Sequence, residues 1–193
     1  MLYKTCISVA TKGTLRAETV EWLLRAFVQL APQVEVQIVT DPRPLEHARN
    51  LQVHRFLATD CTHLFLLDSD CVPQNRTVQR LLSWQMPVVA APHPTMKGAE
   101  VGLMVLDRAG DDYVQHSPWT GLQEVDAVGT AGLLVERTVF ARFGPPWFHC
   151  VYDTGGLLMK SEDFWFCDRA VEAGLQIWAD CDLAQTHMVT VRL

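Results

Sequence analysis

The sequence lacks long apolar runs, basic clusters and paired cysteines. No apolar stretch approaches the roughly 20 residues that a membrane helix needs, and the N-terminal stretch MLYKTCISVATKG has no secretory signal pattern. Lysine and arginine are scattered and the net charge is −6, so the basic patch of nucleic-acid binders is missing. The six cysteines form no CxxC pair, which favours free thiols. We therefore expect a cytoplasmic protein without a membrane span.

The composition is that of one soluble globular domain. The chain has 193 residues, of which 49% are hydrophobic and 20% are charged. No internal repeat, low-complexity tract or linker divides it. We therefore expect a single domain over residues 1–193.

Apolar strand patterns alternate with helical patterns in the first half. The spacing predicts strands over 5–11, 34–41 and 63–67, with helices over 17–30 and 45–59 between them. This β-α-β-α-β order implies a mainly parallel α/β sheet covered by helices. In such sheets ligands bind at the carboxyl ends of the strands, where Thr11, Asp41 and Asp68 fall.

The second half is less regular. We expect helices over 75–84 and 161–174, strands over 87–92 and 176–180, and a hairpin over 101–116 that turns at Ala109-Gly110. Residues 123–144 read as strand, glycine turn, strand and short helix.

The segment Asp68-Ser69-Asp70 places two carboxylates directly after the apolar run HLFLL. Hard oxygen ligands at a strand end suit Mg²⁺ or Mn²⁺, which would in turn hold a diphosphate. Asp and Ser also start turns readily, so an ordinary turn explains the tripeptide equally well.

Glu162 and Asp163 begin the helix over 161–174, with Ser161 as the expected cap and Gly174 as the expected stop. Acidic residues suit the positive end of a helix, and this alone accounts for them. The functional alternative is a general base that faces an acceptor hydroxyl.

Three further features have both a structural and a functional interpretation. His187 could be a third metal ligand if the C-terminal tail returns to the aspartates, or an ordinary hydrogen-bonded histidine. Gly129 and Gly132 could let backbone approach a sugar, or simply form a tight turn. Trp147 follows two prolines and is the best candidate for an exposed aromatic platform against a sugar ring, although most aromatics are expected in the core.

These pieces occur in the order of a known family. The chain resembles GT-A-type glycosyltransferases, especially small family-2-like enzymes of bacteria and phages. The matching segments span roughly residues 5–188 and are ISVAT (7–11), HARN (47–50), FLLDSD (65–70), VDAVGTAGLLVERTVF (125–140), PWF (146–148), SEDFWFCDRAVEAGLQIWAD (161–180) and THM (186–188).

The resemblance implies a Mn²⁺ or Mg²⁺ site and an inverting sugar transfer. Asp68, Asp70 and His187 match the metal site, with Asp70 the direct ligand and Asp68 nearer the ribose and the metal-bound waters. Asp163 matches the catalytic base, and Glu162 stands beside it. A retaining route stays open, because the metal site is common to both mechanisms.

The resemblance also implies a nucleotide-binding half over 1–92 and an acceptor-binding, metal-completing half over 93–193. The donor would be a nucleotide-sugar, with UDP- or GDP-sugars favoured. The acceptor is open: glycan, protein, lipid, small molecule or modified DNA base. Positions that match donor contacts are Thr11, Asp41, Arg49, Ser69, Gly129 and Gly132, although TDP stands where many relatives have an acidic pair, which weakens the assignment of Asp41.

Two alternatives compete with this interpretation. A nucleotidyltransferase uses a similar fold and metal but usually needs a glycine-rich basic loop after the first strand, and ATKGTLRAE has few glycines. A non-catalytic nucleotide- or carbohydrate-binding domain would bind the same ligands without releasing nucleotide.

Overall fold

A mixed seven-stranded sheet forms the centre of the molecule. The computed structural model describes residues 3–40, 44–97, 100–110 and 112–188. The strands run in the order β10-β15-β5-β12-β3-β1-β2. Their bounds are β1 Thr5–Thr11, β2 Val34–Thr40, β3 His63–Asp68, β5 Val88–Ala90, β10 Leu122–Val125, β12 Leu133–Glu136 and β15 Ile177–Asp180. Five of them share one direction, and β12 and β10 run against it. The prediction of a mixed, mainly parallel α/β sheet is confirmed.

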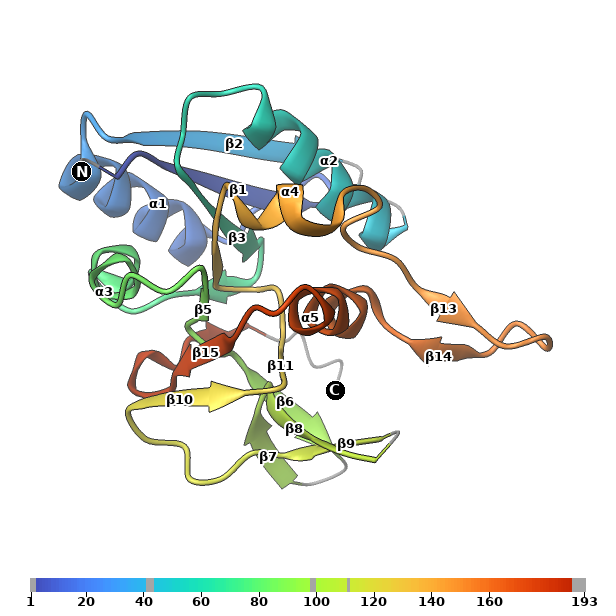
Figure 1. The fold of residues 1–193 in the computed structure, drawn as a ribbon. Helices are drawn as coiled ribbons and strands as arrows, with labels where there is room; N and C mark the ends of the chain where they lie inside the picture. The colour runs from blue at the N-terminus through green and yellow to red at the C-terminus, as the bar shows by residue number, and fades with distance from the viewer. Residues whose placement is uncertain (1–2, 41–43, 98–99, 111, 189–193) are drawn as a thin grey trace.

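Helices cover both faces of this sheet (Figure 1). Along β3, Phe65 and Leu67 pack in the core cluster that includes α1 and α3, whereas Leu64 and Leu66 pack in the cluster that includes α2, α4 and α5. A strand that is buried on both faces needs such a continuous apolar run. The helices are α1 Ala17–Leu30, α2 Leu45–Leu57, α3 Thr77–Ser83, α4 Val139–Phe143 and α5 Glu162–Glu172, with a 3₁₀ turn at Cys181–Leu183.

Small sheets extend this framework. The predicted hairpin is formed by β8 and β9, while the segment before it, β7, pairs with β6 instead. β13 and β14 form an arm that projects from the body beside α5 (Figure 1). The bounds are β4 Cys71–Val72, β6 Pro94–Lys97, β7 Glu100–Leu103, β8 Val105–Ala109, β9 Asp112–Gln115, β11 Ala127–Val128, β13 Val151–Tyr152, β14 Leu158–Lys160 and β16 Thr186–His187.

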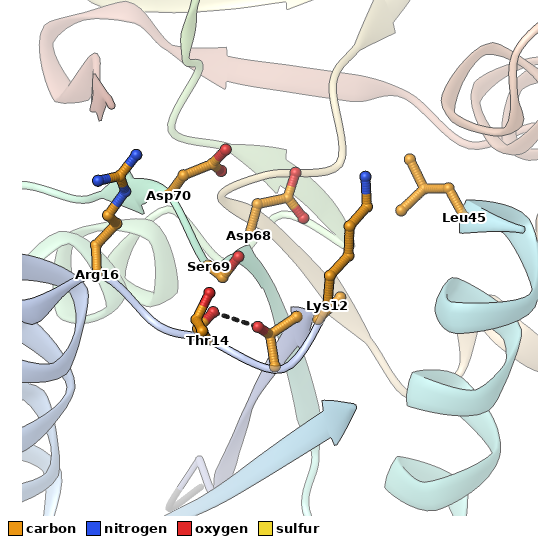
Figure 2. Close-up of a pocket in the computed structure, with 9 residues that line it drawn as sticks. Lys12, Thr14, Arg16, Leu45, Asp68, Ser69 and Asp70 are labelled. Carbon is orange, nitrogen blue, oxygen red and sulfur yellow. Dashed lines mark hydrogen bonds between the residues drawn. The ribbon is translucent and has the colours of Figure 1, made fainter. Parts of the chain in front are cut away.

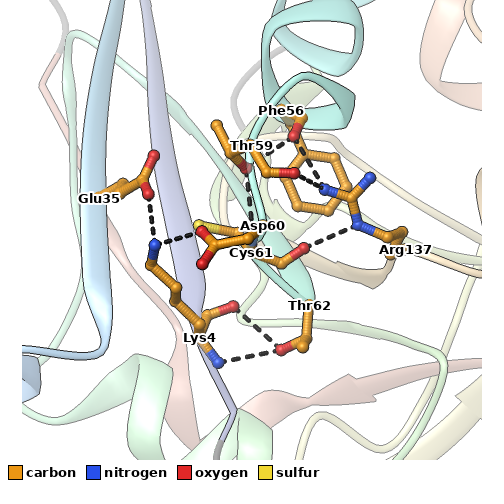
Figure 3. Close-up of polar contacts among 8 residues, drawn as sticks. All are labelled: Lys4, Glu35, Phe56, Thr59, Asp60, Cys61, Thr62 and Arg137. Carbon is orange, nitrogen blue, oxygen red and sulfur yellow. Dashed lines mark hydrogen bonds and ion pairs between the residues drawn. The ribbon is translucent and has the colours of Figure 1, made fainter.

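Polar side chains join the elements at the amino ends of β1 and β3 (Figure 3). Lys4 pairs with Glu35 on β2 and with Asp60 before β3. The guanidinium of Arg137 donates to the carbonyls of Phe56, Leu57, Thr59 and Cys61. A helix leaves its last carbonyls without intrahelical partners, so Arg137 caps the C-terminal end of α2.

Two expectations from composition concern the cysteines and the membrane. All six cysteines are free, and five of them are buried. In the described part of the chain, no helix has both the length and the apolar character needed to cross a bilayer.

Candidate functional site

A cavity of about 460 Å³ opens at the carboxyl ends of β1 and β3 (Figure 2). Its walls come from the end of β1, the loop before α1, the first residue of α2 and the segment after β3. The lining residues are Ala10, Thr11, Lys12, Thr14, Arg16, Leu45, Asp68, Ser69 and Asp70. This is the rim where a parallel sheet binds its ligands. The sequence placed Thr11, Asp68, Ser69 and Asp70 here but did not assign Lys12, Thr14 or Arg16 to ligand binding.

Backbone contacts fix the segment that carries the two aspartates. The carbonyl of Ser69 accepts hydrogen bonds from the Arg16 amide at 3.2 Å and from the Thr19 hydroxyl at 3.1 Å. The same hydroxyl lies 3.3 Å from the carbonyl of Cys71. The start of α1 therefore holds the Asp68–Asp70 segment against the cavity.

Asp68 forms an ion pair with a buried arginine on α2. Arg49 on α2 is 1% exposed, and its Nη2 lies 2.6 Å from Asp68 Oδ1. Its Nη1 contacts Gln52 Oε1 at 3.3 Å, and Gln52 in turn donates to the Ser8 carbonyl on β1. The resemblance assigns Arg49 to the nucleotide, yet in this structure its side chain reaches the site through Asp68 rather than through the open cavity.

His187 lies beside Asp70, and Asp68 is not part of this group. β16 pairs with β4 so that His187 stands opposite Cys71, and the Met188 amide donates to the Asp70 carbonyl. His187 Nε2 is 3.8 Å from Asp70 Oδ2. Its Nδ1 is 3.3 Å from the Pro94 carbonyl, so a proton on Nδ1 leaves the Nε2 lone pair facing the carboxylate.

This pair fits a hard divalent cation. Asp70, Cys71 and His187 have potential ligand atoms within 4.8 Å of one another. Burial raises the pKa of the Cys71 thiol, which leaves the carboxylate and the imidazole as donors. One ion with bonds of about 2.1 Å can touch both, because their separation is below twice that length. Asp68 is not in this group.

The acidic pair begins α5. Ser161 stands at the cap position, but its hydroxyl binds Asp163 Oδ1 instead of the backbone, so the capping prediction is wrong in detail. Oδ1 of Asp163 also accepts from the Phe164 amide at 2.9 Å. Glu162 is 6% exposed, and its pKa is raised first by burial and then by Asp163. The half-buried Asp163 is thus the more accessible of the two carboxylates.

His93 is a site residue that the sequence analysis missed. It follows β5, and its ring centroid lies 5.5 Å from that of His187 in an edge-to-face arrangement. Burial lowers its pKa, while Asp68 and Asp163 act in the opposite direction, which places it within the field of both acids. The strand-end rule that selected Asp68 could also have selected His93.

The two glycines have packing reasons of their own. A Cβ on Gly129 would lie 2.3 Å from His93 Cε1. Gly132 has φ +86°, and a Cβ there would lie 2.0 Å from Gln185 Nε2. Both positions therefore need glycine because side chains of the protein itself, His93 and Gln185, pack against the backbone there.

Other predicted contacts have different outcomes. The prediction that Trp147 forms an exposed platform is wrong, because its side chain is 4% exposed. Asn50 on α2 accepts a hydrogen bond from the Trp147 amide and so anchors this backbone against the helix. The Trp147 Nε1 donates to the Phe140 carbonyl. The hydroxyl of Thr11, at the end of β1, donates to the Thr14 carbonyl in the loop that follows. Asp41 falls outside the described residues.

Comparisons with known proteins support the fold. Neither a protein-family model nor a curated protein sequence matches the chain. Among solved structures, A197 from STIV is similar with a TM-score of 0.71 and 18% identity over 97% of this chain and 86% of that one. GalNAc-T7, crystallised with UDP, GalNAc and Mn²⁺, gives a TM-score of 0.61 and 14% identity over 99% of this chain. TarS 1–349 from S. aureus gives 0.54 and 13% over 96%.

The chain spans 45% of the GalNAc-T7 chain and 60% of the TarS chain. GalNAc-T7 and TarS are glycosyltransferases, and the central sheet with its flanking helices matches their GT-A architecture. At these identities the likeness establishes the fold.

Proposed function

We propose that this protein is a metal-dependent glycosyltransferase that moves a sugar from a nucleotide-sugar to an acceptor hydroxyl. The observation that carries the proposal is the approach of His187 Nε2 to Asp70 Oδ2 at 3.8 Å, beside a cavity at the sheet's ligand-binding rim. Two GT-A glycosyltransferases share the fold, and one of them was crystallised with UDP and Mn²⁺. We infer a UDP- or GDP-sugar as donor and Mn²⁺ or Mg²⁺ as the cation.

The first half of the chain would bind the donor. Asp70 and His187 would hold the cation, and Asp68, kept in place by Arg49, would face the ribose and the metal-bound waters. A cation bound there would supply Lewis-acid neutralisation of the diphosphate leaving group. Lys12 lines the same cavity and brings a positive charge toward the phosphates.

The second half would activate the acceptor. Ser161 and the Phe164 amide hold Asp163 Oδ1, so Oδ2 is the oxygen we assign to the acceptor proton. A base that removes this proton as the hydroxyl attacks the anomeric carbon gives inversion by a single displacement. The neighbouring Glu162 is 6% exposed, so an acceptor hydroxyl reaches it less easily than Asp163, and we assign it a supporting role.

Turnover of nucleotide-sugars with Mn²⁺ tests the metal site. Asp70→Ala and His187→Ala should each lose most of the Mn²⁺-dependent release of UDP or GDP. The exposed Asp112 and His54 give matched controls, and their alanine variants should keep wild-type rates. Equal turnover in the wild type and all four alanine variants would refute the proposed metal site.

The base is tested separately. Asp163→Asn should bind nucleotide-sugar with wild-type affinity and transfer sugar about 100-fold or more slowly, the lower range for loss of general-base catalysis. A variant that keeps the full rate would refute the assignment. A wild-type protein that binds donor with Mn²⁺ but releases no nucleotide would instead indicate a binding domain.

A further inference from the structure

One side of α1 is apolar but lies in solvent. The helical spacing of Val20, Leu23, Leu24, Phe27 and Val28 predicts a buried face, yet of these only Leu23 is buried, beside Thr19, Trp22 and Ala26. Leu24 and Val28 are 64% and 76% exposed. The helix therefore carries two apolar sides, and the sheet can cover only one of them.

The exposed side of α1 continues onto the edge strand β2. Val36 and Ile38 are exposed and stand in register with Ile7 and Val9, which pack in the same core cluster as α1. The opposite flank of α1 faces the start of α3, where Gln29 bonds to Asn75. We name the α1–β2 surface from its six exposed apolar residues: Val20, Leu24, Phe27, Val28, Val36 and Ile38. Figure 1 shows α1 beside β2 at the sheet's free edge.

The helix part of this surface is self-complementary. Along α1 and its C-cap residue Ala31, the exposed residues 17, 20, 24, 28 and 31 are Ala, Val, Leu, Val and Ala, which read the same in both directions about Leu24, whereas Phe27 falls at the level of Glu21 of the copy. An antiparallel copy of the helix, related by a two-fold axis at Leu24, places Leu24 against Leu24 and Val20 against Val28. Isologous interfaces need this kind of self-matching.

Charge agrees with the same arrangement. Glu21 and Arg25 form an ion pair along α1 and flank the apolar side. With a rise of about 1.5 Å per residue, the two-fold axis brings Glu21 of one copy within about 3 Å, along the helix axis, of Arg25 of the other. Both side chains lie on the same flank of α1, so two cross-interface pairs would form side by side along that flank of the apolar centre.

The edge strand favours helix packing over strand addition. The Ile38 carbonyl already accepts a hydrogen bond from Arg55 Nη1 at 3.1 Å. A strand added to this edge would compete with Arg55, whereas side chains that pack on α1 would not. We infer that the α1–β2 surface binds a second copy of this chain, as a two-fold dimer with antiparallel α1 helices centred on Leu24.

The oligomeric state of the full chain in solution tests this inference. Sedimentation velocity should find a dimer for the wild type, and Leu24→Glu should weaken the dimer about tenfold or more, since it buries two like charges at the axis. Leu158→Glu, an exposed leucine on the projecting β14, should leave the dimer intact. Circular dichroism checks that each variant is folded.

Two further variants test the geometry itself. Leu24→Cys should form an intermolecular disulfide on oxidation, because residue 24 meets its own copy at the axis, whereas Val101→Cys should not. Glu21→Lys should weaken the dimer, and Glu21→Lys with Arg25→Glu should restore it. A monomeric wild type, or a dimer that Leu24→Glu leaves intact, would overturn the inference.

Discussion

Removing the positive charge of Arg49, which pairs with Asp68, should destabilise the protein, and the burial of the Arg49 side chain sets the size of the effect. Arg49→Met keeps the aliphatic length of the side chain but removes the guanidinium, which is 1% exposed and 2.6 Å from Asp68 Oδ1. Losing one partner of a buried ion pair costs about 3–5 kcal/mol. Because the Asp68 side chain is 33% exposed, water screens the remaining charge, and we expect about 2–3 kcal/mol.

The reverse change should cost at least as much. Asp68→Asn removes the carboxylate charge and leaves Arg49 charged where almost no water reaches it, so we expect about 3 kcal/mol or more. Arg49→Met with Asp68→Asn removes both charges and should cost less than the sum of the two single changes. The coupling should be about 2 kcal/mol.

Urea unfolding at pH 7, followed by circular dichroism, measures all four proteins of this cycle. For a chain of this size, Arg49→Met should also lower Tm by about 4–12 °C. Costs that add within about 0.5 kcal/mol would refute the reasoning, because the two side chains would then not act as one pair.

Three other variants have expected outcomes that follow from the structure. Arg137→Ala should lower the free energy of unfolding by about 2–4 kcal/mol, since it leaves four carbonyls without their charged donor; urea unfolding measures this. Gly132→Ala should prevent stable folding, because its Cβ would overlap Gln185, whereas Gly156→Ala, with similar φ and open space, should cost about 1 kcal/mol; soluble yield and Tm compare them. Burial raises the pKa of Glu162, so folding stability falls as pH rises from the ordinary carboxylate pKa to the raised one. Glu162→Gln should therefore raise Tm at pH 7 and leave it unchanged at pH 4.

The fold could be predicted because local pattern and topology agree. Continuous apolar strands that alternate with helices specify a parallel sheet with two covered faces, and the first three strands occur where the sequence puts them. Short strands such as β4 and β16, with two residues each, are too brief to show a period. Their pairing follows from the path of the tail, and this path brings His187 to Asp70.

Periodicity failed where a segment had two apolar sides or where a loop was buried. On α1 the regular spacing marks Leu23, Leu24 and Val28, yet tertiary packing buries Leu23 with Trp22 and leaves Leu24 and Val28 exposed. Trp147 was expected in solvent because prolines precede it, but Asn50 draws the loop onto α2. Such choices depend on contacts between distant segments, which a local pattern does not contain.

Crystals soaked in MnCl₂ show, through anomalous scattering at the manganese edge, whether Asp70 and His187 hold a cation. We expect one peak about 2–2.3 Å from both Asp70 Oδ2 and His187 Nε2, which Asp70→Ala abolishes. A wild-type crystal without density between these two side chains, or with manganese bound elsewhere, would contradict this expectation.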